Sequence, residues 1–254
     1  MRVLMWLTVL SACSDKGSES SAPATDDSAS SGTVVEAVCT EPTEVGCVDE
    51  MILDLSLQDE VSEGEISSES DGDDTVTDVD ATAGGYSAAP RNPWIYVKFT
   101  ADGASKVEID DEAALESMDW DMALKRYIIR LNSKDSGPSC VSSAAMFGFD
   151  YAELDSVPEG LVWQQDDFYS DSCGLAVDSI GGAQTAMAPW WEYSQCVGAT
   201  GVPFFVQLAD GNVLKLAVEK YYEDQDVQDE CNETGSVPMG SEGGYIRLRW
   251  QMLD

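Results

Sequence analysis

The residues best suited to chemistry in this chain are its cysteines, because the sequence contains seven cysteines and no histidine. An even number of cysteines in an exported protein predicts disulfides, and the six that follow Cys13 allow up to three. Cys39 and Cys47 are close enough in the sequence to close a local loop, so we predict that they pair. The other pairings stay open, and the lack of CxxC pairs disfavours a zinc site. The six disulfide candidates are Cys39, Cys47, Cys140, Cys173, Cys196 and Cys231.

The absence of histidine also limits the reactions this chain could catalyse. The usual pairs of nucleophile and base cannot be assembled without it, and no pair of carboxylates stands out among 48 acidic residues. These acids face only 13 basic residues, for a net charge of -35, which excludes binding to a phosphate backbone. We therefore expect a protein that is not an enzyme and has no nucleic-acid partner.

Cys13 stands in a different context from the other cysteines. It follows "MRVLMWLTVLSA", a basic start and an apolar run too short to span a bilayer. Small residues directly before a cysteine resemble the lipidation motif of bacterial lipoproteins, and a polar, low-complexity stretch follows. We predict a signal peptide over 1–12, and a lipidated Cys13 with a flexible acidic tether over 13–33. The alternative is an ordinary signal peptide with an incidental cysteine.

The rest of the chain divides into an acidic region and a β domain. Over 34–85 we expect an acidic β extension, with strands in "MILDLSLQ" and "DTVTDVDATAGG" and a solvated loop in "SEGEISSESDGDD". Over 86–254 the pattern is predominantly β, with "WIYVKF" as one strand and "VPFFVQLADGNVLKLAVEKYY" as two strands around a turn. "GGYIRLRWQML" alternates apolar and polar residues, and "DDEAALES" is the one short stretch of strong helix character.

The segment "DWDMALKRYIIRLN", residues 119–132, does not fit this β pattern by its periodicity. Its apolar residues recur at spacings of three and four, which predicts an amphipathic helix. The shorter piece "RYIIRLN" fits a strand almost as well, because it contains a β-branched pair.

Several motifs in order resemble the HmuY family of bacterial haem-binding lipoproteins. The strongest match is "WDMALKRYIIRLNSKDSG", and "NPWIYVKF" precedes it as in the family. The later matches are "DYAELDSVP", "WWEYSQ", "VQLADGNVLKLAVEKYY" and "GGYIRLRW". The resemblance covers about residues 86–254 and implies an antiparallel β fold with very little helix, in which "KRYIIRLN" is a strand. It also implies a lipid-anchored protein of the cell envelope, in the outer membrane or at the cell surface. Such a protein captures haem without catalysis and passes it to an outer-membrane transporter.

The resemblance further implies that two axial side chains hold the haem iron, histidines in some members and methionines in others. Gln195 stands where one histidine is expected, so Met187 and Met146 become the axial candidates. The competing interpretation makes both methionines gap-filling core residues. The propionates need positive or hydrogen-bonding groups, yet no Lys or Arg occurs between Asp135 and Leu214.

Two hypotheses about function remain. One is capture of haem or a similar flat apolar ligand, for which the aromatic residues of 160–205 could form a pocket. The other is a surface interaction or structural lipoprotein that kept the HmuY scaffold and lost haem binding. The same aromatic residues are equally compatible with a β core or an exposed protein-binding face.

Overall fold

The computed structural model describes residues 38–82 and 91–253. Cys13, the expected signal peptide and the expected tether lie outside these residues. The described part is mostly antiparallel β structure with three short α-helices, which confirms the predicted fold class. No helix in this part is long and apolar enough to cross a membrane.

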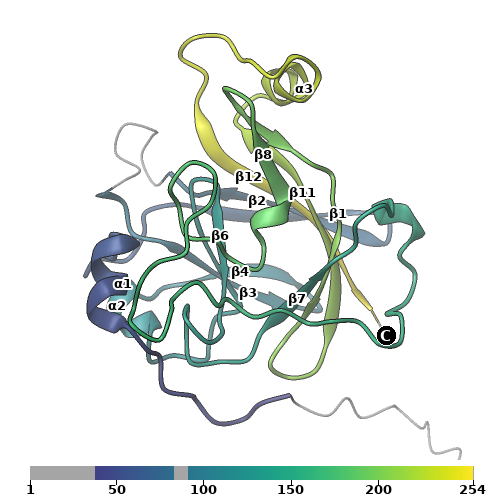
Figure 1. Ribbon diagram of the computed structural model, residues 1–254. Helices are drawn as coiled ribbons and strands as arrows, with labels where there is room; N and C mark the ends of the chain where they lie inside the picture. Colours follow the sequence, from purple (N-terminus) through teal and green to yellow (C-terminus); the bar gives the residue numbers. More distant parts are fainter. Residues whose placement is uncertain (1–37, 83–90, 254) are drawn as a thin grey trace, which may run out of the picture. The chain divides into compact units, whose positions relative to one another are not determined.

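The largest sheet has six strands, and every neighbouring pair in it is antiparallel (Figure 1). The first two strands come from the acidic region, and β2 pairs directly with the C-terminal strand β12. Residues 34–85 therefore contribute to a sheet that they share with the β domain. In order across the sheet the strands are β1 (Ile66–Asp71), β2 (Asp74–Asp80), β12 (Gly243–Leu253), β11 (Val213–Tyr222), β10 (Phe204–Gln207) and β7 (Ser142–Ala145).

A second sheet has four strands, and a two-stranded ribbon completes the β structure. The four-stranded sheet consists of β4 (Gly103–Val107), β3 (Ile95–Thr100), β5 (Met122–Lys125) and β6 (Ile128–Leu131). The ribbon consists of β8 (Trp191–Tyr193) and β9 (Val197–Ala199). Two short 3-10 helices, η2 (Tyr151–Glu153) and η3 (Ala188–Trp190), lie in the connections.

The main core contains side chains from both large sheets. Val97 and Leu124 of the four-stranded sheet belong to the same buried cluster as Val218 and Leu248 of the six-stranded sheet. On β12 the expected alternation is confirmed, because Ile246, Leu248 and Trp250 are buried and their neighbours are more exposed.

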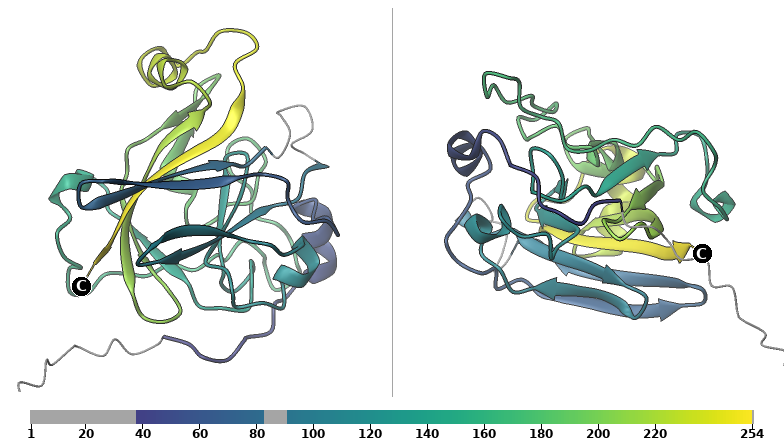
Figure 2. Two further views of the ribbon diagram at one scale, coloured as in Figure 1. Left: turned by 180° about the vertical axis from the view of Figure 1, so that it is seen from behind. Right: turned by 90° about the horizontal axis from the view of Figure 1, so that it is seen from below.

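A second core lies on the other face of the four-stranded sheet, beneath helices α1 (Val48–Asp54) and α2 (Asp111–Ala114). The two helices lie near each other, away from α3 (Gln225–Thr234), which follows β11 (Figures 1 and 2). Met51 and Leu55 pack here with Trp94 and Trp120. The four-stranded sheet is thus covered by apolar side chains on both faces.

Three predictions from the local pattern were wrong. The first half of "MILDLSLQ" is the end of helix α1, and Met51 and Leu55, four residues apart, both reach the second core. The loop expected in "SEGEISSESDGDD" contains β1, an exposed edge strand that pairs with β2 along its whole length. The third was the helix expected over 119–132, which is instead the β5–β6 hairpin with its turn at Arg126 and Tyr127. The resemblance predicted a strand there, but the turn divides "KRYIIRLN" between two strands.

The six cysteines form three disulfides, but Cys39 and Cys47 do not pair with each other. The bonds are Cys39–Cys140, Cys47–Cys173 and Cys196–Cys231. The reason is tertiary: Thr43 donates from its backbone N–H to the carbonyl of Pro138, which places this segment beside residues 138–140. Each of the first two cysteines is thereby bonded to a segment that is distant in the sequence.

Candidate functional site

A cleft of about 850 Å³ opens between the β5–β6 turn, the β8–β9 ribbon and the chain leading into β12. Its volume lies within the range of about 300–1,000 Å³ that is usual for cofactor and small-molecule sites. Four tyrosines line it, from three separate parts of the sequence: Tyr127, Tyr193, Tyr221 and Tyr222.

The floor of the cleft is made of packed aromatic rings. Tyr127 lies edge to face against Trp191, with 4.8 Å between ring centroids, and Tyr221 lies in the same way against Tyr222 at 5.0 Å. All four side chains are buried, and parts of the Tyr127, Tyr221 and Tyr222 rings face the cleft. Edge-to-face pairs of this kind add about 0.5–1.5 kcal/mol beyond the area they bury. The floor is therefore a set of aromatic rings held in place by their packing against one another.

Two glycines allow the tyrosine rings to lie where they do. A Cβ atom built on Gly243 would lie 2.3 Å from a ring carbon of Tyr221. One built on Gly182 would lie 2.6 Å from the hydroxyl oxygen of Tyr127. Any larger residue at either position would displace the neighbouring ring.

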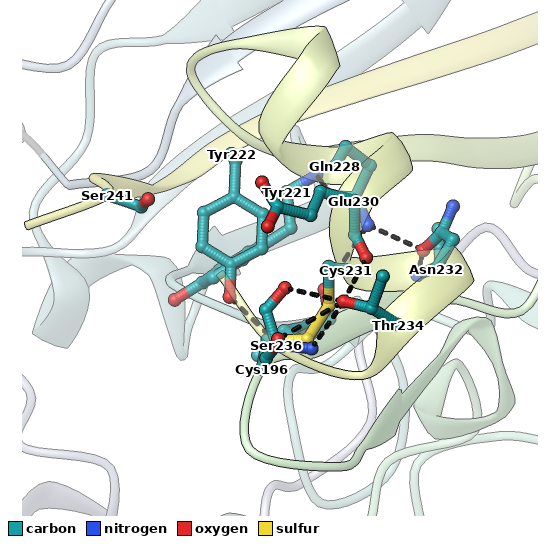
Figure 3. Close-up of a disulfide and its surroundings, with 12 residues drawn as sticks. Cys196, Tyr221, Tyr222, Gln228, Glu230, Cys231, Asn232, Thr234, Ser236 and Ser241 are labelled. Atoms are coloured by element: carbon teal, nitrogen blue, oxygen red, sulfur yellow. Dashed lines mark hydrogen bonds between the residues drawn. A yellow bond between two sulfur atoms is a disulfide. The ribbon is translucent and has the colours of Figure 1, made fainter. Parts of the chain in front are cut away.

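Helix α3 and a disulfide brace one wall of the cleft. Cys196 in the ribbon is bonded to Cys231 on α3, and the backbone N–H of Val197 donates to the hydroxyl of Tyr222 at 3.1 Å. The side chain of Gln228 is fully buried: it accepts from the Tyr221 N–H and donates to the Val197 carbonyl. Figure 3 shows the disulfide with Tyr222 and the α3 side chains around it. Helix, ribbon and β11 are thus joined by covalent and hydrogen bonds.

One arginine supplies the positive charge at the cleft. Arg126 is partly buried at the β5–β6 turn, with its guanidinium carbon 5.9 Å from the Tyr127 ring centroid. Among the described residues that line the cleft it is the one cation, and Glu242 is the one acid. Burial, reinforced by the charge of Asp178, raises the pKa of Tyr127 to about 12. This phenol is therefore neutral at ordinary pH and can donate a hydrogen bond.

Two exposed side chains at the cleft are of types that occur as iron ligands in haem proteins. Tyr193 is 51% exposed, and Met239 on the loop after α3 is fully exposed. Gln195, the residue at the position expected for a family histidine, also lines the cleft. The sequence reasoning missed Met239. Its one signal was that Val237 and Met239 are apolar residues within the otherwise polar stretch "ETGSVPMGSEGG".

The structure does not bring together the two methionines predicted as axial ligands. Met187 is fully buried in the main core, and Met146 is 7% exposed in a separate cluster with Leu154 and Phe205. Neither is among the residues that line the cleft. As placed, both side chains fill core volume, and a ligand in the cleft would not contact them.

The described residues thus form a mostly antiparallel β fold with a cleft lined by aromatic residues. The HmuY protein family model matches residues 91–233, and the chain belongs to that family. A search of curated proteins finds no match.

Solved structures with similar chains are distant in sequence. One is from Bacteroides vulgatus and is assigned as HmuY-like and heme binding. It shares 15% identity over 70% of this chain and 91% of its own, with a TM-score of 0.43. The apo HmuY analog of Tannerella forsythia shares 13% identity over 77% of this chain and 100% of its own, with a TM-score of 0.42. A protein of Bacteroides fragilis assigned as a lipoprotein shares 14% identity over 72% of this chain and 91% of its own, with a TM-score of 0.40.

Proposed function

We propose that this protein is a lipid-anchored, HmuY-type binding protein of the bacterial cell envelope that captures haem in the tyrosine-lined cleft. The observation that carries the proposal is the cleft itself. It is a space of about 850 Å³ with a floor of buried aromatic rings and one arginine at its margin. A macrocycle with apolar faces and an anionic edge matches that distribution of surface.

The described residues fit haem in side-chain type. Arg126 would pair with a propionate, and the Tyr127 hydroxyl would donate a hydrogen bond to the same end of the ligand. Tyr193 and Met239 would hold the iron, since phenolate and thioether both occur as haem ligands. Bound haem would supply its characteristic Soret absorption, which makes the proposal directly measurable.

The experiment is a titration of the mature protein with haemin, followed by the Soret band in the ferric and the reduced state. We expect a saturable shift whose position changes in Tyr193→Phe and in Met239→Leu. Tyr151→Phe, a tyrosine outside the cleft, is the matched control and leaves the spectrum unchanged. Absence of a saturable shift in both oxidation states would sink the proposal.

The absence of histidine favours a second function, a surface interaction lipoprotein that kept the HmuY scaffold without haem. In that case the cleft would receive an apolar segment of a protein partner. The same titration separates the two functions, because this alternative predicts no Soret shift at any haemin concentration.

Anchoring is proposed on the sequence motif that ends in Cys13. An anchor and tether would place the cleft just outside a membrane, where haem could pass to an outer-membrane transporter. Labelling of cells with radioactive palmitate should mark the wild-type protein and not Cys13→Ser. Equal labelling of both proteins would show that the lipid is attached elsewhere.

A further inference from the structure

A second concave surface, of about 700 Å³, lies where β7 and β10 meet the segments 163–167 and 184–186. It shares no lining residue with the tyrosine-lined cleft. We call it the amide groove, because four glutamines line it. They are Gln164, Gln165, Gln184 and Gln207.

The polar groups of the amide groove are available to a ligand. Within the described residues, no hydrogen bond involves the side-chain amide of any of these four glutamines. Ser142 adds a hydroxyl group to the lining, and Trp163 adds an indole. Trp163 is partly buried and packs on the cluster that contains Met146 and Phe205, which fixes its position. The groove therefore combines several free donors and acceptors with one anchored aromatic ring.

The walls of the amide groove are held in place before any ligand arrives. Gln164 and Ser143 exchange two backbone hydrogen bonds, each of 2.8 Å, which fix the 163–167 segment to β7. The carboxylate of Asp166, fully buried, accepts from the backbone N–H groups of Leu131 and Ala186, both at 2.8 Å. One carboxylate thus ties two walls to the β5–β6 hairpin. Such preorganisation reduces the entropy that a ligand must overcome on binding.

The charge of the amide groove is balanced. Lys134 is its cation, and it forms an ion pair with Asp167, the acid in the same lining. A chain of net charge -35 also repels anions at long range. An apolar ligand would leave the glutamine amides without partners, which costs binding energy. The remaining class is a neutral ligand rich in hydrogen-bonding groups.

We propose that the amide groove binds neutral carbohydrate. Each glutamine amide both donates and accepts, as sugar hydroxyl groups do, so one amide can serve two neighbouring hydroxyls. The indole of Trp163 offers a flat apolar surface for the C–H face of a pyranose ring. This site is independent of the haem proposal, since it uses other residues on another surface.

The test uses the mature protein on a printed array of neutral oligosaccharides (glucans, mannans, galactans and N-acetylglucosamine oligomers). Calorimetry then measures affinity for the best-bound sugar. We expect Gln184→Ala to weaken binding about five- to tenfold, the effect of one lost hydrogen bond. Trp163→Ala should weaken it further. Gln251→Ala, on β12 outside the groove, is the matched control and should bind as the wild type does.

Trp163→Ala could also loosen the cluster beneath it, so its thermal unfolding is compared with that of the wild type. Gln165→Ala and Gln184→Ala remove exposed side chains and keep the test valid if Trp163→Ala is unstable. Haemin titration should give the same result for all these variants as for the wild type. The proposal is overturned if no neutral glycan is retained, or if Gln165→Ala and Gln184→Ala bind as the wild type does.

Discussion

The guanidinium carbon of Arg130 lies 4.3 Å from the ring centroid of Trp94, and both side chains are buried. The buried acid Asp111 is linked to Arg130 through the Tyr96 hydroxyl. Asp111 also accepts from the backbone N–H groups of Gln58 and Trp94. A buried cation is therefore stabilised by aromatic faces and by one carboxylate that organises the chain around it.

Arg130→Met should destabilise the protein by about 3–5 kcal/mol, because it removes a buried cation whose charge favours the Asp111 carboxylate. The double variant with Asp111→Asn should lose less than the sum of the two single variants, since neither charge then remains alone. Urea denaturation of the wild type, the two single variants and the double variant measures the free energy of unfolding of each. Additive losses would show that the two residues are not coupled.

Stability should rise when the solution is made mildly acidic. Burial raises the pKa of both Asp111 and Asp166 to about 6, while an aspartate in an unfolded chain titrates near about 3.9. Between these values the folded state holds more protons, so stability falls as pH rises through this window. Each group accounts for up to about 3 kcal/mol.

Urea denaturation between about pH 4 and 7 at constant ionic strength measures this dependence. The asparagine in Asp166→Asn cannot titrate, so the free energy of unfolding of this variant should depend less on pH, whatever its stability at neutral pH. A wild-type curve that declines as the pH falls from 7 to about 5 would contradict the prediction.

Removing the Cys196–Cys231 disulfide should weaken both the fold and ligand binding in the tyrosine-lined cleft. The loop it closes spans 35 residues, which corresponds to about 3–4 kcal/mol. Haemin titration of Cys196→Ser/Cys231→Ser should show weaker binding, because the wall that carries Tyr222 loses its brace. Cys47→Ser/Cys173→Ser is the control: it opens a disulfide of separation 126 that joins α1 to the region around Tyr169. It should lower stability and leave haemin affinity unchanged in the protein that remains folded.

Gly243→Ala should disturb the floor of the same cleft. The added methyl would lie 2.3 Å from a ring carbon of Tyr221, so the ring or β12 must move, at a cost of about 1–3 kcal/mol. Gly198→Ala is a matched control, since its methyl would meet its nearest neighbour at 3.5 Å, an ordinary contact. Thermal unfolding and haemin titration should both separate the two variants. Equal stability and equal haemin affinity of the two variants would mean that the Tyr221 ring can move aside without cost.

The alternation of apolar and polar residues predicted a strand correctly only where one face of the strand is buried and the other is more exposed. β12 has one face in the core and one more exposed, so the alternation of Ile246, Leu248 and Trp250 identified it correctly. β5 is buried on both faces, and all four of its residues are inaccessible. Its sequence therefore does not alternate between apolar and polar residues. Because of the turn at Arg126 and Tyr127, the apolar residues of the hairpin have the spacing of three and four that is typical of a helix. The ordered motifs of the HmuY family predicted β structure where periodicity did not.

The sequence could not reveal features that depend on contacts between distant segments. Cys39 lies beside Cys140 because the segment that follows Cys39 packs against residues 138–140, and Cys47 pairs with another distant residue, Cys173. The cleft could not be predicted either, since Tyr127 and Tyr221 each belong to an ordinary β pattern. Only the folded hairpins bring these rings together.

The Cys39–Cys140 disulfide also determines how the protein would carry mechanical load. Force that enters the chain at Val38 reaches Cys39 and passes through the disulfide to Cys140, so residues 40–139 lie inside a closed covalent ring. Strands β1 to β6 all belong to that ring and would not be peeled away from their N-terminal end. If the protein is held by a tether and pulled by a partner, β7 would be the first strand to bear the force. Strands β1 to β6, half of the strands, would not bear it.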